Sequence, residues 1–571
     1  MSKTITLFGR RAYKPHKETI KMSKLSLKKT YPTKPTLSQA LPYKFDSCPT
    51  GKNLIYTSNR HVIIQNIDQI EKSHIFSEHK YDVEVAKMSP SGALVASADK
   101  VGNIMIWKNN QESSGTGNSS KEILATHRFG QKVYHFDWSY DSNFLLICGS
   151  ETLLLNIQEN KCLQFEALFA PVTAGAICPK PLSNGDLTII LCAGAGQNER
   201  ITYTANTTGI EFRNKQKMSV RFNDIKFNSA GTKFAIAATT GEIFVYDYNG
   251  MPSESQNERK IANAHNSSCC AISWSPNKTD NEKLVSCSTD KTVKIWEVQN
   301  LKEVACHKFS EGLSDMQQGV VWNKSGMIVS ISLSGDINYL ENFDDQNQNS
   351  NQKTIVKVLN PSDDRKKLMD AKIDQNQNKL HPDLLKILQN KNFSEKTSVA
   401  TNNNGLIIIS GQYKNHSTGD QGFTKIFRNV DGKLIENIEE SKNLQKMING
   451  GATSLKFNHK GDILAVGEMQ EKCVRLFEIT EGNGIKQKSH IYAHSSQILN
   501  LSWSNDDKFL VSSELQGKIC IWNTLAGKKK TVVDQSHRNS KVTGFSWSGE
   551  RSFYTFGSDG LVKEWEVAEG F

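Results

Sequence analysis

Histidine, serine and aspartate recur together along this chain, a combination that hydrolases use for nucleophilic catalysis. The two clearest groups are His265, Ser286 or Ser288, Asp290 and Trp296, and, later in the chain, His537, Asp559 and Trp565. In both groups the tryptophan stands six residues after the aspartate. A catalytic triad is needed once, so its repetition at a regular interval favours a structural lock within a repeated unit.

Two further groups keep the histidine and the tryptophan but deviate between them. They are His79 with Trp107, where Val101 stands at the turn position of the aspartate, and His494 with Trp522, where Gln516 stands there. These two units therefore fit the lock pattern less well.

Other chemistry receives little support from the sequence. His490 and His494 are four residues apart, but they precede a strand and have no third ligand nearby, so zinc is not expected. The chain contains no phosphate loop, no zinc-protease motif and no nucleophile elbow, and the glycines at 194–196 do not open a helix. The sequence thus predicts no enzymatic activity, no cofactor and no metal.

The elements that carry these groups are short strands. All nine tryptophans end an alternating run such as AISW or TVKIW, and turns rich in Ser, Gly, Asn and Asp separate the runs. The units repeat every 40–50 residues. Four strands per unit at this period are typical of the blades of WD-repeat β-propellers.

The repeats predict an all-β fold of tandem WD-repeat β-propellers. Residues 39–341 hold about seven units and form the first propeller. Residues 342–397 are an Asn/Gln-rich insert with room for short helices and for one strand of a vestigial blade over 355–363. Residues 398–571 form a second, shortened propeller with four clear blades. An open ring of this kind leaves a sheet edge that the insert, the N-terminal arm or a partner must cover.

The charge of the chain lies mainly at its start. The net charge is +11, and residues 1–35 hold ten Lys or Arg residues against one acid. This composition predicts a flexible basic arm over residues 1–38. The eleven cysteines form no C-x-x-C pair, which favours reduced thiols in the cytoplasm, and no apolar run is long enough to span a membrane.

The segment SLSGDINYLE, residues 332–341, is a degenerate repeat. Ser334 stands where Asp290 stands in the well-formed repeat, and Leu340 stands where Trp296 stands. The strand pattern survives, so we expect a seventh blade that is held by packing more than by a lock.

Four stretches of the chain resemble one family of tandem WD propellers, the actin-interacting protein 1 family. They are 51–68, 78–107, 315–341 and 536–567, of which the stretch QQGVVW…SLSGDINYL is the most specific. The resemblance implies a non-catalytic, monomeric protein of the cytoplasm and cytoskeleton that binds actin filaments together with cofilin and promotes their disassembly. Nucleic acid, membranes and small-molecule substrates are not expected. A WD scaffold of a ciliary or ribonucleoprotein assembly is the alternative.

The resemblance also suggests binding residues. The family has aromatic and basic positions at the end of the fourth blade, and Phe212 and Arg213 match them loosely. Its acidic loop is not recognisable here, and Glu151 is the candidate for it. An aromatic anchor beside an arginine suits an interaction hot spot, although Phe212 could instead be a core strand residue.

Overall fold

The structure is a computed structural model of the 571-residue chain. It describes residues 25–37, 45–68, 73–109, 122–165, 168, 171–193, 198–251, 257–276, 282–310, 312–341, 355–359, 398–402, 405–413, 421–430, 433–448, 451–480, 484–525, 530–538, 540–569 and 571. The chain divides into two compact units. The first unit comprises Met1–His16 and Pro32–Asp364, and the second comprises Lys17–Tyr31 and Arg365–Phe571.

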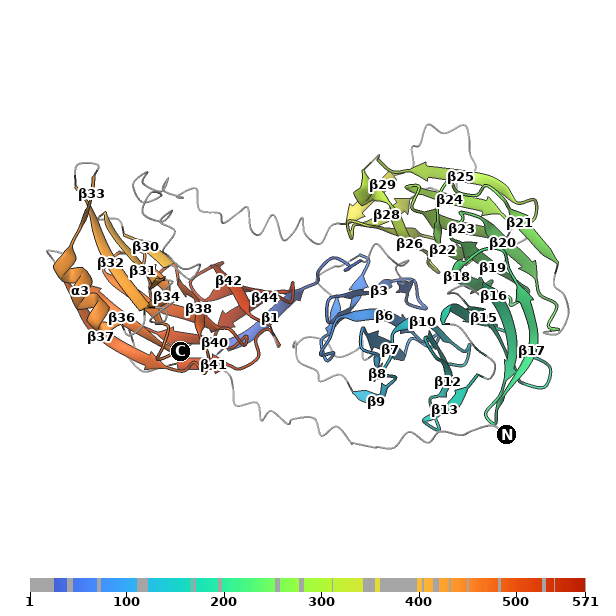
Figure 1. Cartoon of the computed structure of the whole chain (residues 1–571), viewed down its shortest axis with the longest axis horizontal. Helices are drawn as coiled ribbons and strands as arrows, with labels where there is room; N and C mark the ends of the chain where they lie inside the picture. Colours follow the sequence, from blue (N-terminus) through green and yellow to red (C-terminus); the bar gives the residue numbers. More distant parts are fainter. Residues whose placement is uncertain are drawn as a thin grey trace. The chain divides into compact units, whose positions relative to one another are not determined.

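The described residues of the first unit form seven antiparallel sheets of four strands each (Figure 1). The first sheet consists of β2 (Asp46–Ser47), β3 (Asn53–Ser58), β4 (His61–Asn66) and β5 (His74–Phe76). The second consists of β6 (Val83–Met88), β7 (Leu94–Asp99), β8 (Asn103–Lys108) and β9 (Ile123–Arg128). The third consists of β10 (Val133–Trp138), β11 (Phe144–Gly149), β12 (Thr152–Asn156) and β13 (Lys161–Gln164). The fourth and fifth sheets are β14 (Val172–Ile177), β15 (Leu187–Ala193), β16 (Glu199–Ala205) and β17 (Ile210–Lys217); and β18 (Phe222–Phe227), β19 (Lys233–Ala238), β20 (Ile243–Asp247) and β21 (Glu258–Ile261). The sixth and seventh sheets are β22 (Cys269–Trp274), β23 (Lys283–Ser288), β24 (Thr292–Glu297) and β25 (Lys302–Lys308); and β26 (Gln317–Trp322), β27 (Ile328–Ser332), β28 (Ile337–Glu341) and β29 (Ile355–Leu359). A short 3-10 helix, η2 (Leu313–Asp315), precedes β26.

These seven sheets close into a ring. The first strand of each sheet contacts the first strand of the next from β6 to β26, and β6 also contacts β2 and β3. The seventh sheet packs on the first through an apolar cluster that includes Tyr56, Ile63, Val329 and Tyr339. The core thus lies between neighbouring sheets, and the unit is a seven-bladed β-propeller in which each sheet is one blade.

Burial follows the order of the strands within a sheet. The second strands, such as β11 and β15, are buried along their whole length because sheets cover both of their faces. The outermost strands alternate between half-buried and exposed residues, as in β37 (Ile485–Tyr492) of the second unit. Side chains that can meet a partner therefore lie on outermost strands and in the turns.

The described residues of the second unit form four such sheets. The first two are β30 (Ser398–Thr401), β31 (Leu406–Tyr413), β32 (Gln421–Val430) and β33 (Lys433–Glu436); and β34 (Ala452–Phe457), β35 (Ile463–Glu468), β36 (Cys473–Ile479) and β37. The last two are β38 (Ile498–Trp503), β39 (Phe509–Glu514), β40 (Ile519–Asn523) and β41 (Lys530–Val533); and β42 (Val542–Trp547), β43 (Ser552–Gly557), β44 (Val562–Val567) and β1 (Leu25–Tyr31). The helix α3 (Ile438–Met447) packs on β32 and is capped by Asn437, whose side chain accepts a hydrogen bond from the Glu440 N–H. The all-β architecture of tandem WD-type propellers is confirmed.

Two sequence predictions are wrong in part. The flexible arm expected over residues 1–38 contains β1, which pairs antiparallel with β44 and buries Leu25 in the core of the last sheet. The insert expected over 342–397 contains β29, at the place of the strand expected over 355–363, and β29 is the outermost strand of the seventh sheet. β1 pairs with residues more than 500 positions later, which a local pattern does not reveal, whereas β29 pairs with the preceding strand, β28. The remaining parts of both segments lie largely outside the described residues, including the helices expected in the insert.

In the part of the chain that the structure describes, no helix is long and apolar enough to cross a bilayer.

Candidate functional site

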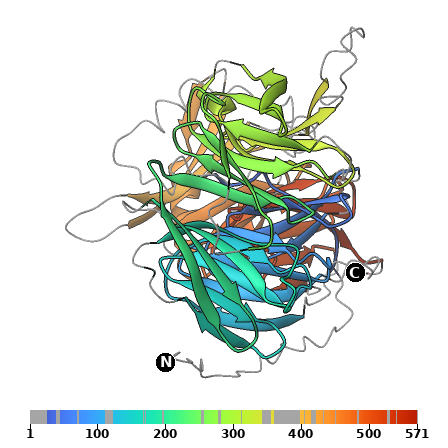
Figure 2. The same ribbon diagram turned by 90° about the vertical axis from the view of Figure 1, so that its right-hand side faces the viewer.

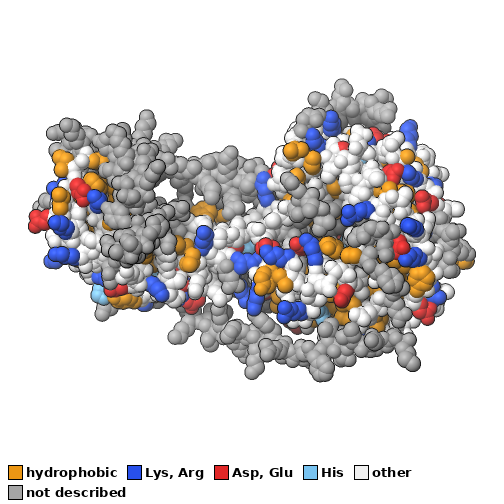
Figure 3. Space-filling view, in the orientation of Figure 1, with side chains coloured by type: hydrophobic (Ala, Val, Ile, Leu, Met, Phe, Trp, Pro, Cys, Tyr) orange, Lys and Arg blue, Asp and Glu red, His pale blue; other side chains and the backbone are white. Residues whose placement is uncertain are grey.

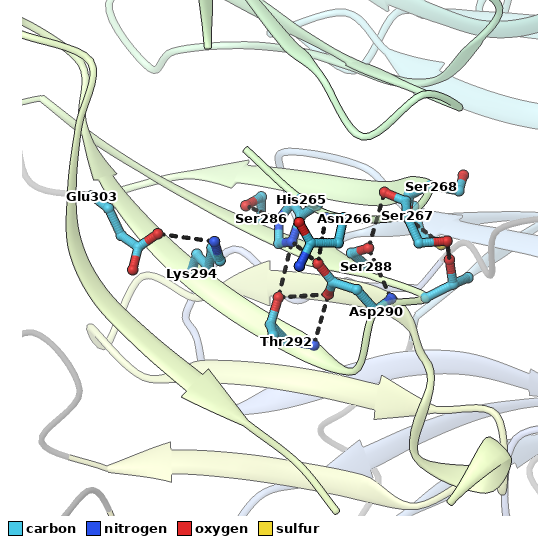
Figure 4. A network of polar contacts seen from close by, with 12 residues as sticks. His265, Asn266, Ser267, Ser268, Ser286, Ser288, Asp290, Thr292, Lys294 and Glu303 are labelled. Carbon is cyan, nitrogen blue, oxygen red and sulfur yellow. Dashed lines mark hydrogen bonds and ion pairs between the residues drawn. The ribbon is translucent and has the colours of Figure 1, made fainter. Parts of the chain in front are cut away.

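The lock of the sixth sheet joins a loop and two strands (Figure 4). The Trp296 indole N–H donates to Ser286 Oγ at 2.8 Å, and this hydroxyl lies 2.7 Å from His265 Nε2. On its other side, His265 Nδ1 lies 3.1 Å from a carboxylate oxygen of Asp290. Ser286, not Ser288, therefore supplies the hydroxyl. Its side chain is fully buried, so a substrate cannot reach it, and the arrangement holds the sheet together instead of cleaving a bond.

The last sheet has the same lock with threonine in place of serine. His537 Nε2 lies 2.7 Å from Thr555 Oγ1, which also accepts the Trp565 indole N–H at 2.9 Å. His537 Nδ1 lies 3.0 Å from both carboxylate oxygens of Asp559. Gly557 leaves the space that this network needs, because an added Cβ would lie 2.1 Å from His537 Nδ1.

The two groups that fit the pattern less well also form locks, but the acid comes from a position other than Val101 and Gln516. In the second sheet, His79 Nε2 lies 2.7 Å from Ser97 Oγ, and the carboxylate that faces its Nδ1, at 3.7 Å, comes from Asp99. In the sheet formed by β38–β41, the tenth in chain order, Glu514 takes this role, and its carboxylate lies 3.2 Å from His494 Nδ1. Each of these acids stands two residues before the turn position, at the end of the second strand.

Burial sets the protonation state of the locks. It lowers the pKa of His494 to about 4, although Glu514 opposes this shift. Burial alone would raise the pKa of Asp290, but hydrogen bonds with His265 and Thr292 outweigh it and hold that pKa well below its ordinary range. Near neutral pH the tenth sheet therefore holds a neutral histidine beside an ionised acid.

The axis of the first unit is lined by a second polar cluster. Lys87 Nζ lies 2.6 Å from Asp137 and 3.8 Å from Asp46, so it joins the innermost strands of the first three sheets. Burial alone would lower the pKa of Lys87, but these carboxylates raise it above its ordinary value. This cluster stabilises the ring, and its small cavity is also lined by Asp224 and Lys226.

One group in the second unit has metal-binding residue types. The ligand atoms of Glu468, Glu471 and Cys473 lie within 4.8 Å of one another. Arg475 Nε lies 2.6 Å from Glu468, and its terminal nitrogen lies 2.9 Å from Glu471. The guanidinium already balances both carboxylates, so this group is an ion-pair network.

The structure places Phe212 and Arg213 together on β17, the outermost strand of the fourth sheet, at the rim that faces the viewer in Figure 2. A β-bulge between Phe212 and Asn214 turns both side chains outward, and Phe212 is 51% exposed. The Arg213 guanidinium donates to Thr204 Oγ1 at 2.7 Å and to Glu211 at 2.5 Å. The alternative that Phe212 is a core residue is therefore wrong, and an aromatic side chain beside a positioned arginine is available to a partner.

Glu151 does not join this pair. It lies in the turn between β11 and β12 of the third sheet, exposed, where Gln131 donates a hydrogen bond to it at 3.5 Å. That turn is at the end of the sheet where the first strand begins, whereas Phe212 lies near the opposite end, beside the turn that joins β16 to β17.

Exposed apolar side chains lie at the same end of the strands as Glu151, and sequence reasoning missed them. They include Tyr81, which is 45% exposed, and Val101, which is 36% exposed. The backbone bond from Lys100 N to Asp82 O holds their two loops together. Their loop positions would have been the signal, because binding residues lie disproportionately on loops held by a rigid scaffold. Figure 3 shows that hydrophobic and charged side chains are interspersed on the face it presents.

Comparison with known proteins found a family model that matches two of the repeats and relatives that are similar over most of the chain. The model of the family "WD domain, G-beta repeat" matches residues 257–297 and 485–523. The chain is 24% identical to WD repeat-containing protein 1 of Xenopus tropicalis and of Gallus gallus, over 95% of this chain and 99% of each relative. It is also 24% identical to actin-interacting protein 1 of Drosophila melanogaster, over 95% of this chain and 98% of that protein.

Proposed function

We propose that this chain, a diverged member of the family of WD repeat-containing protein 1 and actin-interacting protein 1, binds actin filaments. One observation carries the proposal. The similarity extends over 95% of the chain and almost the full length of a relative that is named for its interaction with actin. A match confined to single repeats would indicate only a propeller, whereas this one follows both units.

The chain acts without catalysis, as a rigid platform that promotes filament disassembly together with cofilin in the cytoplasm, as a monomer. The residues that could have formed a hydrolase triad support this proposal, because Ser286 is buried and bonded to Trp296. The interlocked sheets give the loops and outermost strands a fixed geometry, which lowers the entropy that binding costs.

The bulge on β17 is the proposed contact with actin or cofilin. Phe212 packs edge-to-face on Tyr203 with a ring separation of 5.8 Å, so its position is defined even though half of its surface is open. Arg213 is held by Thr204 and Glu211. Preorganised aromatic and arginine side chains of this kind contribute most to interfaces.

Co-sedimentation with filamentous actin, with and without cofilin, tests the proposal. We expect the full chain to pellet with filaments, and Phe212→Ala to weaken this binding by roughly 30-fold, the size expected for a hot-spot residue. Leu124→Ala is the matched control, because Leu124 is the bulge residue of the outermost strand β9 and is 42% exposed. An unmodified chain that stays in the supernatant in both conditions would overturn the function. Equal binding by the Phe212 and Leu124 variants would refute only the assignment of the β17 bulge as the contact surface.

A further inference from the structure

The seam between the first and seventh sheets of the first unit has few of the features that join other sheets. The first strand of the first sheet, β2, has only two residues. In the seventh sheet, Ser334 and Leu340 replace the aspartate and tryptophan of the lock. The apolar cluster and a hydrogen bond from the Asn323 side-chain amide to Gly51 O cross this seam, and a further contact would add to them.

A segment from the start of the chain, Pro32–Leu37, lies along this seam. The Tyr56 hydroxyl donates to Thr33 O at 3.1 Å, and the Ser58 hydroxyl donates to Lys34 O at 2.7 Å. The Asn59 N–H donates to Thr36 Oγ1 at 3.0 Å. These contacts bind the segment to β3 and to the turn that follows it.

The seventh sheet holds the same segment from the other side through the turn of SLSGD. Lys34 Nζ lies 2.7 Å from Asp336, whose other carboxylate oxygen accepts the Ser334 hydroxyl at 2.7 Å. Gly335 has a φ of +81°, and an added Cβ there would lie 2.8 Å from Pro35 O. The turn is thus shaped to accept the backbone of this segment and the charge of its lysine.

We propose that residues 56–59, which are the end of β3 and the residue after it, form a peptide-binding groove together with the turn 332–336. Its ligand is an extended peptide segment that carries a lysine between two prolines. In this chain its own residues 32–37 occupy the groove and fasten the first ring. The prolines suit this role because they restrict the unbound segment and reduce the entropy lost on docking. Pro32, Thr33 and Pro35 are buried, and Leu37 packs on the apolar cluster that closes the ring. The inference concerns ring closure and does not depend on actin binding.

The segment can leave without unfolding of the sheets, because single hydrogen bonds and one ion pair hold it and no strand ladder does. Hydrogen exchange of the full chain measures this opening at the Thr36 and Asn59 amides. We expect Asp336→Asn and Lys34→Met each to accelerate exchange of these amides by about five-fold, the usual upper value for a partly exposed ion pair. A chain that carries both Lys34→Asp and Asp336→Lys should regain most of the protection.

Glu242→Gln is the matched control. Glu242 forms a comparable ion pair with Lys260, at 2.6 Å and with side chains 17% and 40% exposed, against 26% and 29% for Asp336 and Lys34. It should leave the seam amides unchanged. Two results would refute the claim that residues 32–37 fasten the ring. In one, the seam amides of the Asp336 variant exchange as slowly as those of the unmodified chain. In the other, Glu242→Gln accelerates exchange of the same amides equally.

Binding in trans tests the groove itself. The probe is a fluorescent peptide with the sequence of residues 30–38, added to the full chain that carries Thr33→Glu and Lys34→Glu. We expect it to bind this variant at least ten-fold more tightly than the unmodified chain, whose own segment competes at high effective concentration. A peptide with glutamate in place of its lysine should not bind. Equal binding of both peptides, or no binding to the variant, would overturn the assignment of the groove.

Discussion

Replacement of Asp99 should weaken the second sheet of the first unit, although the repeat pattern assigns the turn position to Val101. Asp99 is 1% exposed, and its carboxylate accepts hydrogen bonds from the Val101 N–H at 3.1 Å and the Asn103 N–H at 2.9 Å. It also accepts the Asn103 side-chain amide at 2.8 Å. Asp99→Ala leaves the Val101 and Asn103 N–H groups and His79 without this partner. We expect a loss of about 3 kcal/mol, since the net contribution of a hydrogen bond to a charged group is about 1.5–3 kcal/mol.

Hydrogen exchange resolved to β6–β9 measures this loss, because the two units need not unfold together. Val101→Asp is the paired test, since it installs an acid at the position that the repeat pattern favours. Val101 is on the surface, so this change should shift the stability of the sheet by less than about 0.5 kcal/mol. If Val101→Asp restores the stability of the Asp99→Ala chain, the acid that serves the lock is not fixed at the end of β7, and the reasoning fails.

Two further perturbations follow from the geometry. His494 has a folded-state pKa of about 4, below its ordinary 6.5, so its contribution to stability is complete above about pH 6.5 and is lost as the pH falls toward 4. The loss reaches about 3 kcal/mol, and exchange of β38–β41 between pH 7 and 4.5 should show this slope in the unmodified chain but not in His494→Gln. Leu25→Ala should cost about 2–5 kcal/mol and speed exchange in β44, because Leu25 is 3% exposed in the core of the last sheet. Unchanged exchange in β44 would mean that β1 does not complete this sheet in solution.

The sequence predicted the features that local pattern determines. The period and the paired tryptophan frames indicated four-stranded sheets, and the six-residue interval from Asp290 to Trp296 identified a lock whose atoms lie within hydrogen-bonding distance. Asp99 and Glu514 were missed because a carboxylate at the end of a strand reaches the same histidine atom as one in the turn. Only the directions of the side chains show whether the acid that contacts the histidine comes from the strand end or from the turn.

Contacts between segments that are far apart in the chain could not be predicted from the sequence. Nothing near β1 indicates that it pairs with β44, more than 500 residues later. Likewise, the turn around Gly335 and Asp336 lacks the residues of the lock, but it forms an ion pair with Lys34 and lies against the backbone of Pro35. The sequence gives no sign of this contact. For the binding residues, the resemblance suggested Phe212 and Arg213 as one site with Glu151. The fold separates Glu151 from the other two, because the turns at the two ends of a sheet face opposite directions.

The central claim is that the chain acts on actin filaments. Time-lapse fluorescence imaging of surface-tethered filaments, partly decorated with cofilin, tests it most directly when the purified full-length chain is added. The account predicts a higher frequency of filament breaks with the chain than with cofilin alone, and a reduced effect for Phe212→Ala but not for Leu124→Ala. Filaments whose breakage and shortening are unchanged by the unmodified chain at micromolar concentration would contradict it.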